Sequence, residues 1–490
     1  MGINTTKYLL SAALLLSSLT AFSFSQPRRH LSPKTISGQR AAVAQRSSSF
    51  IGDKRQLVVL ASFSDLEFRQ EEPLTIWEPI FNQVNFKDSL HYGSVRDYFY
   101  DQSYGKFNLQ FDLYDIKVNK EHAVYRSTAT DDANAALLII DLVDSLKNII
   151  TDWAPYDWNN DGYVDQIFVL YAGMGQNNGG GSNTIWANQA SLTIYDHDPI
   201  TVSSNDTEYK INNYGCFPEY GTNSSSFGTL CHEFGHCLGL PDFYYNNYSI
   251  LGDWDIMDNG NYNNDGYCPP CYSAHERMML GWLDIKELTS PTSITGMPAL
   301  SNEPVAYMIR NDNYPNEYYI LENRQKTGWD QSLPGSGLVI FHVDYDEYLW
   351  LYDIPNNYTN NHYTIVAANN MSYTPLSYGW AYPFNSKDSL TNYSAPAATL
   401  RHEAKDGTKL LSKPITNIKV DDDGLVSFDF MGGEQTAIQQ TETEEHVTAV
   451  YDLHGRKIPV SHLKEGIYIF RYTNGNTKKV LWSPNKQVRL

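Results

Sequence analysis

Residues Phe227 to Asp242 read FGTLCHEFGHCLGLPD, and this stretch decides how the rest of the chain is interpreted. His232 and His236 stand at positions i and i+4, so a helix places both imidazoles on one face, about one turn apart. At that spacing a single Zn²⁺ can bind both side chains. Glu233 is offset by one residue, too far round the helix to be an easy third ligand. It is well placed to take a proton from a zinc-activated water.

Gly239 is expected to end this helix. Glycine has no side chain and enters the left-handed backbone region that turns a chain back. The turn returns Asp242 toward the metal as a hard oxygen ligand. An isolated histidine is more often a polar residue without a metal, and it is the joint pattern that indicates zinc. The sequence therefore predicts one catalytic Zn²⁺ held by His232, His236 and Asp242, with Glu233 as general base and acid.

Length and composition limit the classes to which the protein can belong. A chain of 490 residues is too long for one compact core, so two or three domains are expected. Hydrophobic residues make up 41% of it, which is ample for globular cores. The formal net charge of −20 argues against nucleic acid and anionic membrane surfaces as partners.

The N-terminus has the pattern of a targeting segment. A lysine precedes the apolar run Tyr8–Leu19, and small residues follow it. We interpret residues 1–25 as a Sec-type signal peptide, with cleavage after Ser23 or Ser25. This run is short for a transmembrane helix, and no other stretch of about 20 apolar residues occurs, so the mature protein is predicted to be exported without a transmembrane helix. Residues 26–50 are interpreted as a short pro-segment or extended arm.

All five cysteines lie close to the metal motif in sequence. Export permits disulfides, and the odd count leaves at least one thiol outside any internal pair. Cys231 and Cys237 point to different faces of one helix, so we expect no bond between them. Cys268 and Cys271 form a CxxC pair, which favours a local bridge or free buried thiols over redox catalysis. The remaining cysteine is Cys216.

The stretch DWNNDGYVD, which begins at Asp157, resembles the first part of a calcium-binding loop. Oxygen-bearing side chains occupy relative positions 1, 3, 5 and 9, and glycine occupies position 6. The glutamate expected at position 12 is replaced by Phe168, so the loop is not a complete EF-hand. It is either a Ca²⁺ site or an Asx-rich turn that leads into a strand. The candidate calcium ligands are Asp157, Asn159, Asp161 and Asp165.

Periodicity predicts the elements around these motifs. Helices are expected over 92–104, 134–150 and 273–282, and strands over 57–61, 107–113 and 166–172. From about residue 290 to 430, short alternating strands between Asn, Pro and Gly clusters predict a β-sandwich-like region. The predicted organisation is a catalytic domain (51–288), a β-rich accessory domain (289–432), a linker (433–445) and a C-terminal module (446–490).

HEFGHCLGLPD followed by WDIMD resembles the immune-inhibitor-A-like bacterial metalloproteases, a branch of the metzincin clan. The likeness continues through GSVRDYFYDQSYGKFNL upstream and YSAHERMMLGW downstream, and covers roughly residues 50–432. It implies an α+β catalytic domain with a twisted mixed sheet, zinc on His232, His236 and Asp242, and Glu233 as the base. It also implies that Met257 lies in the turn beneath the metal.

Two positions depart from the metzincin pattern. The third zinc ligand of that clan is usually histidine, and here it is Asp242. The tyrosine that some metzincins place two residues after the methionine is absent, because Asn259 occupies that position. Another oxyanion stabiliser, such as one of the nearby tyrosines, is therefore required. Loops such as Asn261–Tyr272 are expected to shape the substrate subsites.

The segment VYDLHGRKIPVSHLKEGIYIFRYTNGNTKKVLW resembles the C-terminal sorting domain of proteins exported by the type IX pathway of Bacteroidetes. It implies that the type IX secretion machinery is a partner and that the protein is secreted or held at the outer-membrane surface. Such tails usually stop near the lysine strand, whereas eight residues (SPNKQVRL) follow it here. The alternative is a small β module that only packs on the rest of the protein.

The function predicted from sequence is a secreted zinc endopeptidase that acts on proteins or peptides. One alternative is a surface binding or adhesion protein that keeps a vestigial zinc motif, although such a protein has no need of the general base Glu233. A second is a thermolysin-like metallopeptidase, in which Glu276 on a downstream helix would be the third ligand. A third is a metallohydrolase that does not act on peptides.

Overall fold

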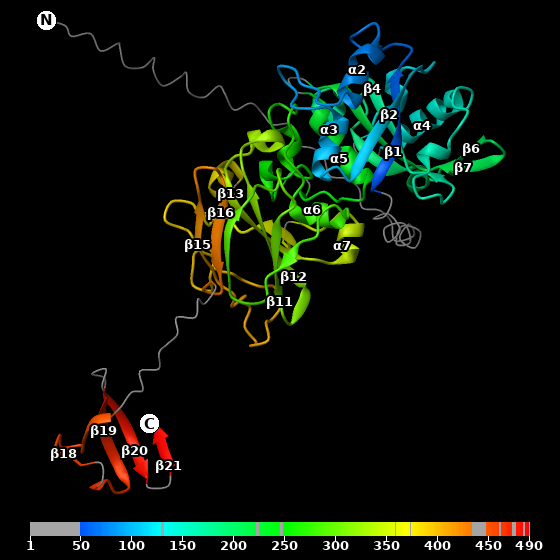
Figure 1. Ribbon diagram of the computed structural model, residues 1–490. Coiled ribbons are helices and arrows are strands. Elements are labelled where there is room, and N and C mark those ends of the chain that lie inside the picture. Colours follow the sequence, from blue (N-terminus) through cyan, green and yellow to red (C-terminus); the bar gives the residue numbers. More distant parts are fainter. Residues whose placement is uncertain are drawn as a thin grey trace, which may run out of the picture. The chain divides into compact units, whose positions relative to one another are not determined.

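The computed structural model describes residues 50–128, 132–221, 225–245, 248–357, 359–372, 374–433, 447–459, 462–472, 477–483 and 486–489. The expected signal peptide, the expected arm apart from Phe50, and the expected linker apart from Gly433 lie outside these residues. The chain divides into two compact units, one ending at Gly433 and the other beginning at Glu434 (Figure 1). No helix among the described residues has the length and apolar character needed to cross a membrane.

A five-stranded mixed sheet forms the N-terminal part of the first unit. Its order is β2-β1-β4-β8-β5, with the first four strands parallel and β5 antiparallel at the edge. All three strands predicted in this region are present in it. Leu57 to Ala61 are fully buried, which explains their continuous apolar run. The strands are β1 (Gly52–Ser62), β2 (Phe107–Lys117), β4 (Ile167–Met174), β5 (Asn188–Ser191) and β8 (Asn213–Tyr220).

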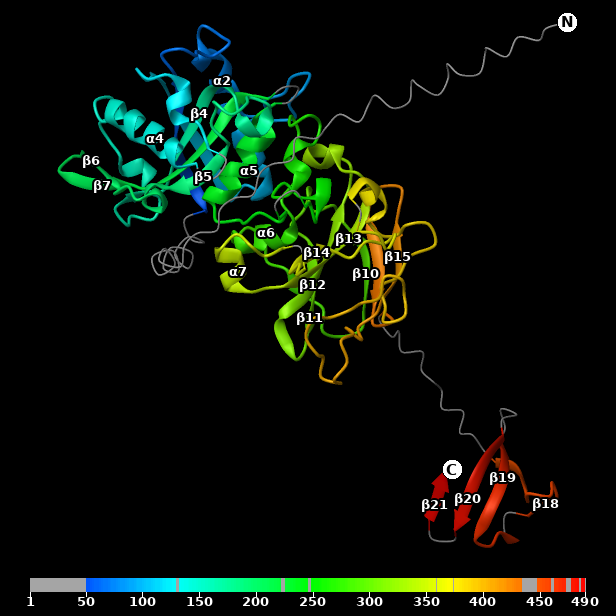
Figure 2. The same ribbon diagram turned by 180° about the vertical axis from the view of Figure 1, so that it is seen from behind.

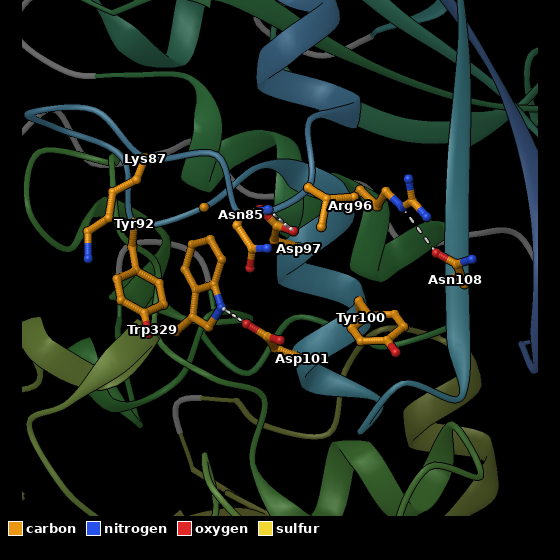
Figure 3. Close-up of a pocket in the computed structure, with 11 residues that line it drawn as sticks. Asn85, Lys87, Tyr92, Arg96, Asp97, Tyr100, Asp101, Asn108 and Trp329 are labelled. Carbon is orange, nitrogen blue, oxygen red and sulfur yellow. Dashed lines mark hydrogen bonds between the residues drawn. The ribbon is translucent and has the colours of Figure 1, made fainter.

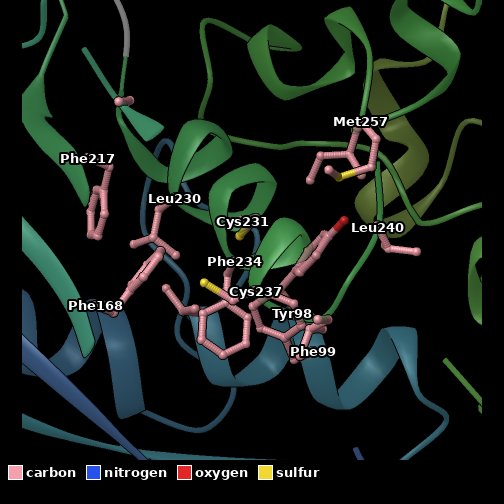
Figure 4. Packing of buried hydrophobic residues seen from close by; sticks show 14 of the residues in the cluster. Tyr98, Phe99, Phe168, Phe217, Leu230, Cys231, Phe234, Cys237, Leu240 and Met257 are labelled. Carbon is pink, nitrogen blue, oxygen red and sulfur yellow. The ribbon is translucent and has the colours of Figure 1, made fainter. Parts of the chain in front are cut away.

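Helices lie on both sides of this sheet, with α3 and α5 on one side and α4 on the other (Figures 1 and 2). Phe234 of α5 anchors the first side, because its ring packs 5.3 Å from Phe168 and 4.7 Å from Phe99, measured between centroids (Figure 4). The predicted helices are present but shorter than expected. They are α3 (Val95–Gln102), α4 (Ala133–Leu146), α5 (Phe227–Cys237) and α6 (Ala274–Met279), and the further helix α2 (Pro73–Asn82) was not predicted from the sequence.

The β-rich part of the first unit contains two facing sheets, as the sequence predicted. One has the order β14-β13-β12-β11-β9 and the other β10-β16-β15. A core that includes Ile309, Leu321, Ile340, Ile415 and Phe428 fills the space between them. Their strands are β9 (Lys286–Glu287), β10 (Thr292–Met297), β11 (Ala306–Asn311), β12 (Tyr314–Arg324), β13 (Gly337–Asp344), β14 (Tyr363–Ile365), β15 (Ile415–Val420) and β16 (Val426–Phe430).

The larger of these sheets is buried on both faces. Leu338 and Ile340 of β13 belong to the core of the sandwich, whereas Val339 and Phe341 belong to the core that also contains α5. Alternate residues of one strand therefore pack against two different regions. This shared packing explains why residues up to Gly433 form one compact unit, and the domain boundary at residue 288 stays a prediction.

Short elements complete the first unit. β3 (Tyr163–Val164), β7 (Thr207–Ile211) and β6 (Ile200–Ser204) form a small sheet in that order. A further α-helix is α7 (Glu347–Leu351). The 3₁₀ turns are η2 (His122–Tyr125), η3 (Ala154–Tyr156), η4 (Gln176–Asn178), η5 (Leu192–Tyr195), η6 (Gly252–Trp254), η7 (Asn259–Tyr262), η8 (Gly328–Ser332) and η9 (Thr374–Gly379).

All five cysteines are buried, and none of them forms a disulfide bond. Cys231 and Cys237 are not bonded to each other, as expected from their positions on α5. Of the two structural interpretations of the CxxC pair, the structure shows free thiols rather than a local bridge. Burial raises the pKa of Cys268 to about 11 and of Cys271 to about 12, so neither thiol is a ready nucleophile at neutral pH.

The second unit is an antiparallel sheet with the order β18-β17-β19-β20-β21. Its small core contains Val450, Phe470 and Val480. The residues beyond the predicted lysine strand are not a loose extension, because β21 pairs with β20 at the edge of the sheet. The strands are β17 (Val447–Tyr451), β18 (Lys457–Ile458), β19 (Gly466–Tyr472), β20 (Thr477–Ser483) and β21 (Lys486–Arg489).

Candidate active site

Helix α5 and the turn after it bring together the three predicted metal ligands. The helix runs from Phe227 to Cys237, and Gly239 has a φ of 94°, in the left-handed region. A Cβ at Gly239 would meet no neighbouring atom, so the backbone conformation rather than crowding calls for glycine. The chain then reverses and carries Asp242 back to the helix face that bears His232 and His236.

The donor atoms of these three side chains converge on one point. The Nε2 atoms of His232 and His236 lie 3.1 Å apart, and the Asp242 Oδ1 atom lies 3.2 Å from the first and 3.1 Å from the second. Each residue is no more than 6% exposed. Among the described residues this is the only group of three or more His, Cys, Asp or Glu side chains with the spacing of a metal site.

The protonation of the two imidazoles fits a cation. His232 Nδ1 lies 2.8 Å from the Ile256 carbonyl oxygen, and His236 Nδ1 lies 2.8 Å from that of Leu240. A carbonyl oxygen only accepts, so each Nδ1 carries a hydrogen, and the Nε2 atom of each ring is the one directed at Asp242 and available to a metal. Three electron-rich atoms at this spacing repel one another unless a positive charge lies between them. The residues present therefore fit a bound Zn²⁺.

Glu233 and Tyr262 lie beside the three donor atoms. Glu233 is 4% exposed and directly follows His232 in α5. Burial raises the pKa of the Tyr262 phenol, hydrogen bonds with Asn261 and Asn177 oppose the rise, and the negative charges of Glu233 and Asp242 add to it. Tyr262 as a whole residue is 41% exposed. It is therefore a candidate for the oxyanion donor that the sequence requires.

Sequence reasoning required an oxyanion donor but did not single out Tyr262. The residue lies in η7, five positions after Met257, inside the loop that was expected to shape the subsites. Nothing in its local sequence distinguishes it from the many other tyrosines of the chain. Only the folded arrangement identifies it.

Met257 packs directly against α5. A Cβ at Gly235 would lie 2.7 Å from Met257 Sδ, so the helix approaches the methionine this closely because residue 235 is glycine. The Phe243 amide donates to the Met257 carbonyl oxygen at 2.9 Å. The turn that carries Asp242 is thus tied to the methionine segment, and the place of Met257 beneath a metal stays a prediction.

Glu276 is not placed to be a metal ligand. It is fully buried and caps its own helix, because its Oε2 atom accepts from the Ser273 amide at 2.6 Å and from the Ser273 hydroxyl at 2.8 Å. It is not a member of the metal-ligand cluster, whose three positions are filled without it. The thermolysin-like arrangement is therefore disfavoured.

Glu276 instead predicts a pH dependence of stability. Burial raises its pKa from 4.5 to about 7, and the Glu322 carboxylate adds to the rise while bonds from Ser273 oppose it. The folded state holds this proton more tightly than the unfolded state, so the stabilisation is present below pH 4.5 and is lost as the pH rises through about 7. Ionisation of Glu276 should therefore lower the free energy of unfolding by up to about 3 kcal/mol between pH 4.5 and a pH above about 7.

Glu276→Gln should flatten that fall, because an amide keeps the capping bonds and does not ionise. The measurement is the free energy of unfolding from denaturant titrations between pH 5 and 8, with chelator present so that metal binding adds no pH dependence. Glu67→Gln, which removes an exposed carboxylate paired with Lys117, is the control and should keep the parent slope. An unchanged slope in Glu276→Gln would refute this account.

The candidate calcium loop has the hydrogen bonds of an Asx-rich turn. The two Asp157 carboxylate oxygens accept from the amides of Asp161 (3.1 Å) and Gly162 (2.9 Å). Asn159 Oδ1 also accepts from the Asp161 amide, and Asp165 Oδ2 from the Trp158 amide. These bonds direct the oxygens to the backbone of the loop. The geometry favours the turn, and the calcium site stays a prediction.

A separate cavity of about 560 Å³ lies beside α3 (Figure 3). In it Trp329 Nε1 donates to Asp101 at 2.8 Å, and Arg96 Nε donates to Asn108 at 3.1 Å. Tyr92 and Tyr100 also line it. None of the metal-ligand candidates reaches this cavity, so it is distinct from the candidate active site.

Comparison with known proteins agrees with the geometry. Residues 53–279 match the family described as immune inhibitor A peptidase M6, catalytic domain, and the match includes α5 and the Asp242 turn. The chain is 24% identical over 290 residues to the pre-pro-metalloprotease PrtV of Vibrio cholerae serotype O1, covering 52% of this chain and 31% of PrtV. It is 25% identical over 286 residues to immune inhibitor A of Bacillus thuringiensis subsp. alesti, covering 46% of this chain and 39% of that protein.

This chain thus spans about a third of the length of the curated relatives it matches. The matched region contains every residue of the metal-ligand cluster. Together these similarities support a metalloprotease with a metal cofactor.

Proposed function

We propose that this chain is a secreted zinc endopeptidase that hydrolyses peptide bonds of extracellular proteins. The observation that carries the proposal is the convergence of His232, His236 and Asp242 within 3.2 Å of one another, with Glu233 on the same helix. This group lies inside the region that matches a metalloprotease catalytic domain. A binding protein has no need of a buried general base such as Glu233 beside these donor atoms.

The side chains have distinct roles in this proposal. When bound, zinc supplies a Lewis acid that lowers the pKa of a water molecule and polarises a carbonyl oxygen. The Glu233 carboxylate accepts the proton of the attacking water and delivers it to the leaving amine. The Tyr262 hydroxyl donates to the carbonyl oxygen as negative charge develops on it. The carbonyl partners of the two histidines keep the imidazoles in one tautomer and orientation.

Further parts of the proposal rest on single features of the fold and the sequence. The contact between Met257 and Gly235 supports a metzincin-type arrangement. The apolar N-terminal pattern supports export through a signal peptide. The likeness of the C-terminal segment to sorting domains, together with its five-stranded sheet, supports delivery by the type IX machinery to the exterior or the outer-membrane surface.

The test is hydrolysis of casein and gelatin by the purified mature protein, with and without a zinc chelator. We expect cleavage that the chelator stops and that added Zn²⁺ restores. A protein that holds zinc and cleaves neither substrate nor a peptide library would contradict the peptidase proposal. That result would favour the surface binding alternative or a metallohydrolase with another substrate.

Tyr262→Phe should lower kcat for peptide hydrolysis by about 10²-fold and leave KM nearly unchanged, because the lost hydroxyl acts mainly on the transition state. Steady-state kinetics on a fluorogenic peptide would measure both constants. Tyr393→Phe is the matched control, because Tyr393 is 96% exposed and should give parent values. A kcat equal to that of the parent would exclude Tyr262 as the oxyanion donor.

A further inference from the structure

The turn that presents Asp242 is held by a segment of the β-rich region. Asp353 Oδ1 accepts a hydrogen bond from the Asp242 amide at 2.5 Å, although the two residues are 111 positions apart in sequence. Asp353 itself has a φ of 61°, a left-handed conformation that non-glycine residues adopt infrequently. The segment directly after α7 therefore takes an unusual backbone conformation at the point where it contacts the turn.

A second residue of this segment holds the next position of the same turn. Asn356 Nδ2 donates to the Phe243 carbonyl oxygen at 2.8 Å, and Asn356 also bonds the amide and carbonyl of Tyr363 in β14. Asn356 is 1% exposed. The Phe243 ring packs on Tyr363, with centroids 4.5 Å apart and planes at 63°. The Asp242–Phe243 turn is thus held by Asp353 and Asn356 of the segment between α7 and β14, and by the ring contact between Phe243 and Tyr363.

We propose that Asp353 is a positioning residue for the third metal ligand and that the β-rich region completes the metal site. The inference rests on the proposed function, since it assumes that Asp242 is a zinc ligand. A hydrogen bond from an amide to a charged carboxylate is stronger than a neutral one, so Asp353 restrains the Asp242 backbone firmly. Partners of this kind orient metal ligands, and their loss weakens metal binding. Asp353 and Asn356 both lie beyond the 53–279 region that matches the catalytic domain.

The test measures zinc affinity by competition with a chromophoric chelator. It compares the full-length mature parent protein with three variants of it. Asp353→Ala is expected to weaken zinc binding by about 10- to 100-fold, because Asp242 loses its backbone restraint. Asp353→Asn keeps the size and an acceptor oxygen but loses the charge, so it should lie between the parent and the alanine variant. The absorption spectrum of the Co²⁺-substituted protein should change in the same order, since it reports ligand geometry.

Asp346→Ala is the matched control. Asp346 lies in the same segment and carries the same charge, but its Oδ1 atom caps α7 by accepting from the amides of Tyr348 and Leu349. It should lower the thermal stability of the metal-free protein without changing zinc affinity or the Co²⁺ spectrum. The Tm of each metal-free variant therefore separates general destabilisation from a change at the metal.

The outcomes distinguish this inference from the proposed function. A parent protein that binds no zinc would overturn the proposed function and this inference with it. A parent that binds zinc, beside Asp353→Ala and Asp353→Asn variants with the parent affinity and Co²⁺ spectrum, would overturn the inference alone. If Asp353→Ala fails to fold, the comparison rests on Asp353→Asn. The zinc affinity and Co²⁺ spectrum of the parent in that variant would again overturn the inference.

Discussion

Glu233→Gln should reduce casein hydrolysis by about 10³-fold while the protein still binds one zinc per chain. General acid–base catalysis by a positioned side chain contributes about 10²- to 10⁴-fold, and an amide of the same shape cannot accept the proton. Glu233 is 4% exposed and is not one of the three converging donors, so its replacement should leave the metal ligands in place. The measurement pairs initial rates of casein cleavage with zinc content of the same samples.

The exposed-site variant Glu67→Gln is the control for Glu233→Gln and should match the parent in both measurements. A Glu233→Gln variant that keeps more than a tenth of the parent rate would show that another group moves the proton. Loss of zinc together with loss of activity would instead mean that Glu233 supports the metal site.

Asp242→Ala should weaken zinc binding by more than about 100-fold, beyond the loss expected for a residue that only supports a ligand. The variant leaves two imidazole ligands where a catalytic zinc site needs three protein ligands. Chelator competition at fixed pH would measure the dissociation constants. Asp144→Ala, which removes an exposed carboxylate from α4, is the control and should bind zinc as the parent does. Parent-like affinity in Asp242→Ala would show that the third ligand is another residue.

Local sequence periodicity was sufficient to predict the helix that bears the two histidines. The i, i+4 spacing, the glycine at position 239 and the aspartate at 242 all lie within the short stretch 232–242, so no long-range information was needed. The same holds for β1, whose continuous apolar run indicates burial on both faces. The facing sheets of the β-rich region followed from alternating strands and turn residues.

Contacts between distant segments were not predictable in this way. Asp353 meets Asp242 only because β13 and β14 place α7 and its following loop against the α5 region. Tyr262 is influenced by the charge of Glu233 because η7 packs beside α5, and no sequence pattern distinguishes this tyrosine from the others. The free state of the CxxC thiols likewise depends on packing that spacing alone does not show.

X-ray absorption at the zinc edge of the purified parent protein tests the central claim most directly, because it counts the atoms around the metal. We expect one zinc per chain, with two imidazole nitrogens at about 2.0–2.1 Å, a carboxylate oxygen at about 2.0–2.2 Å and no sulfur. Sulfur at about 2.3 Å would move the metal to the buried cysteines and contradict the assignment of His232, His236 and Asp242. A protein purified with zinc present that holds none would contradict the zinc peptidase account as a whole.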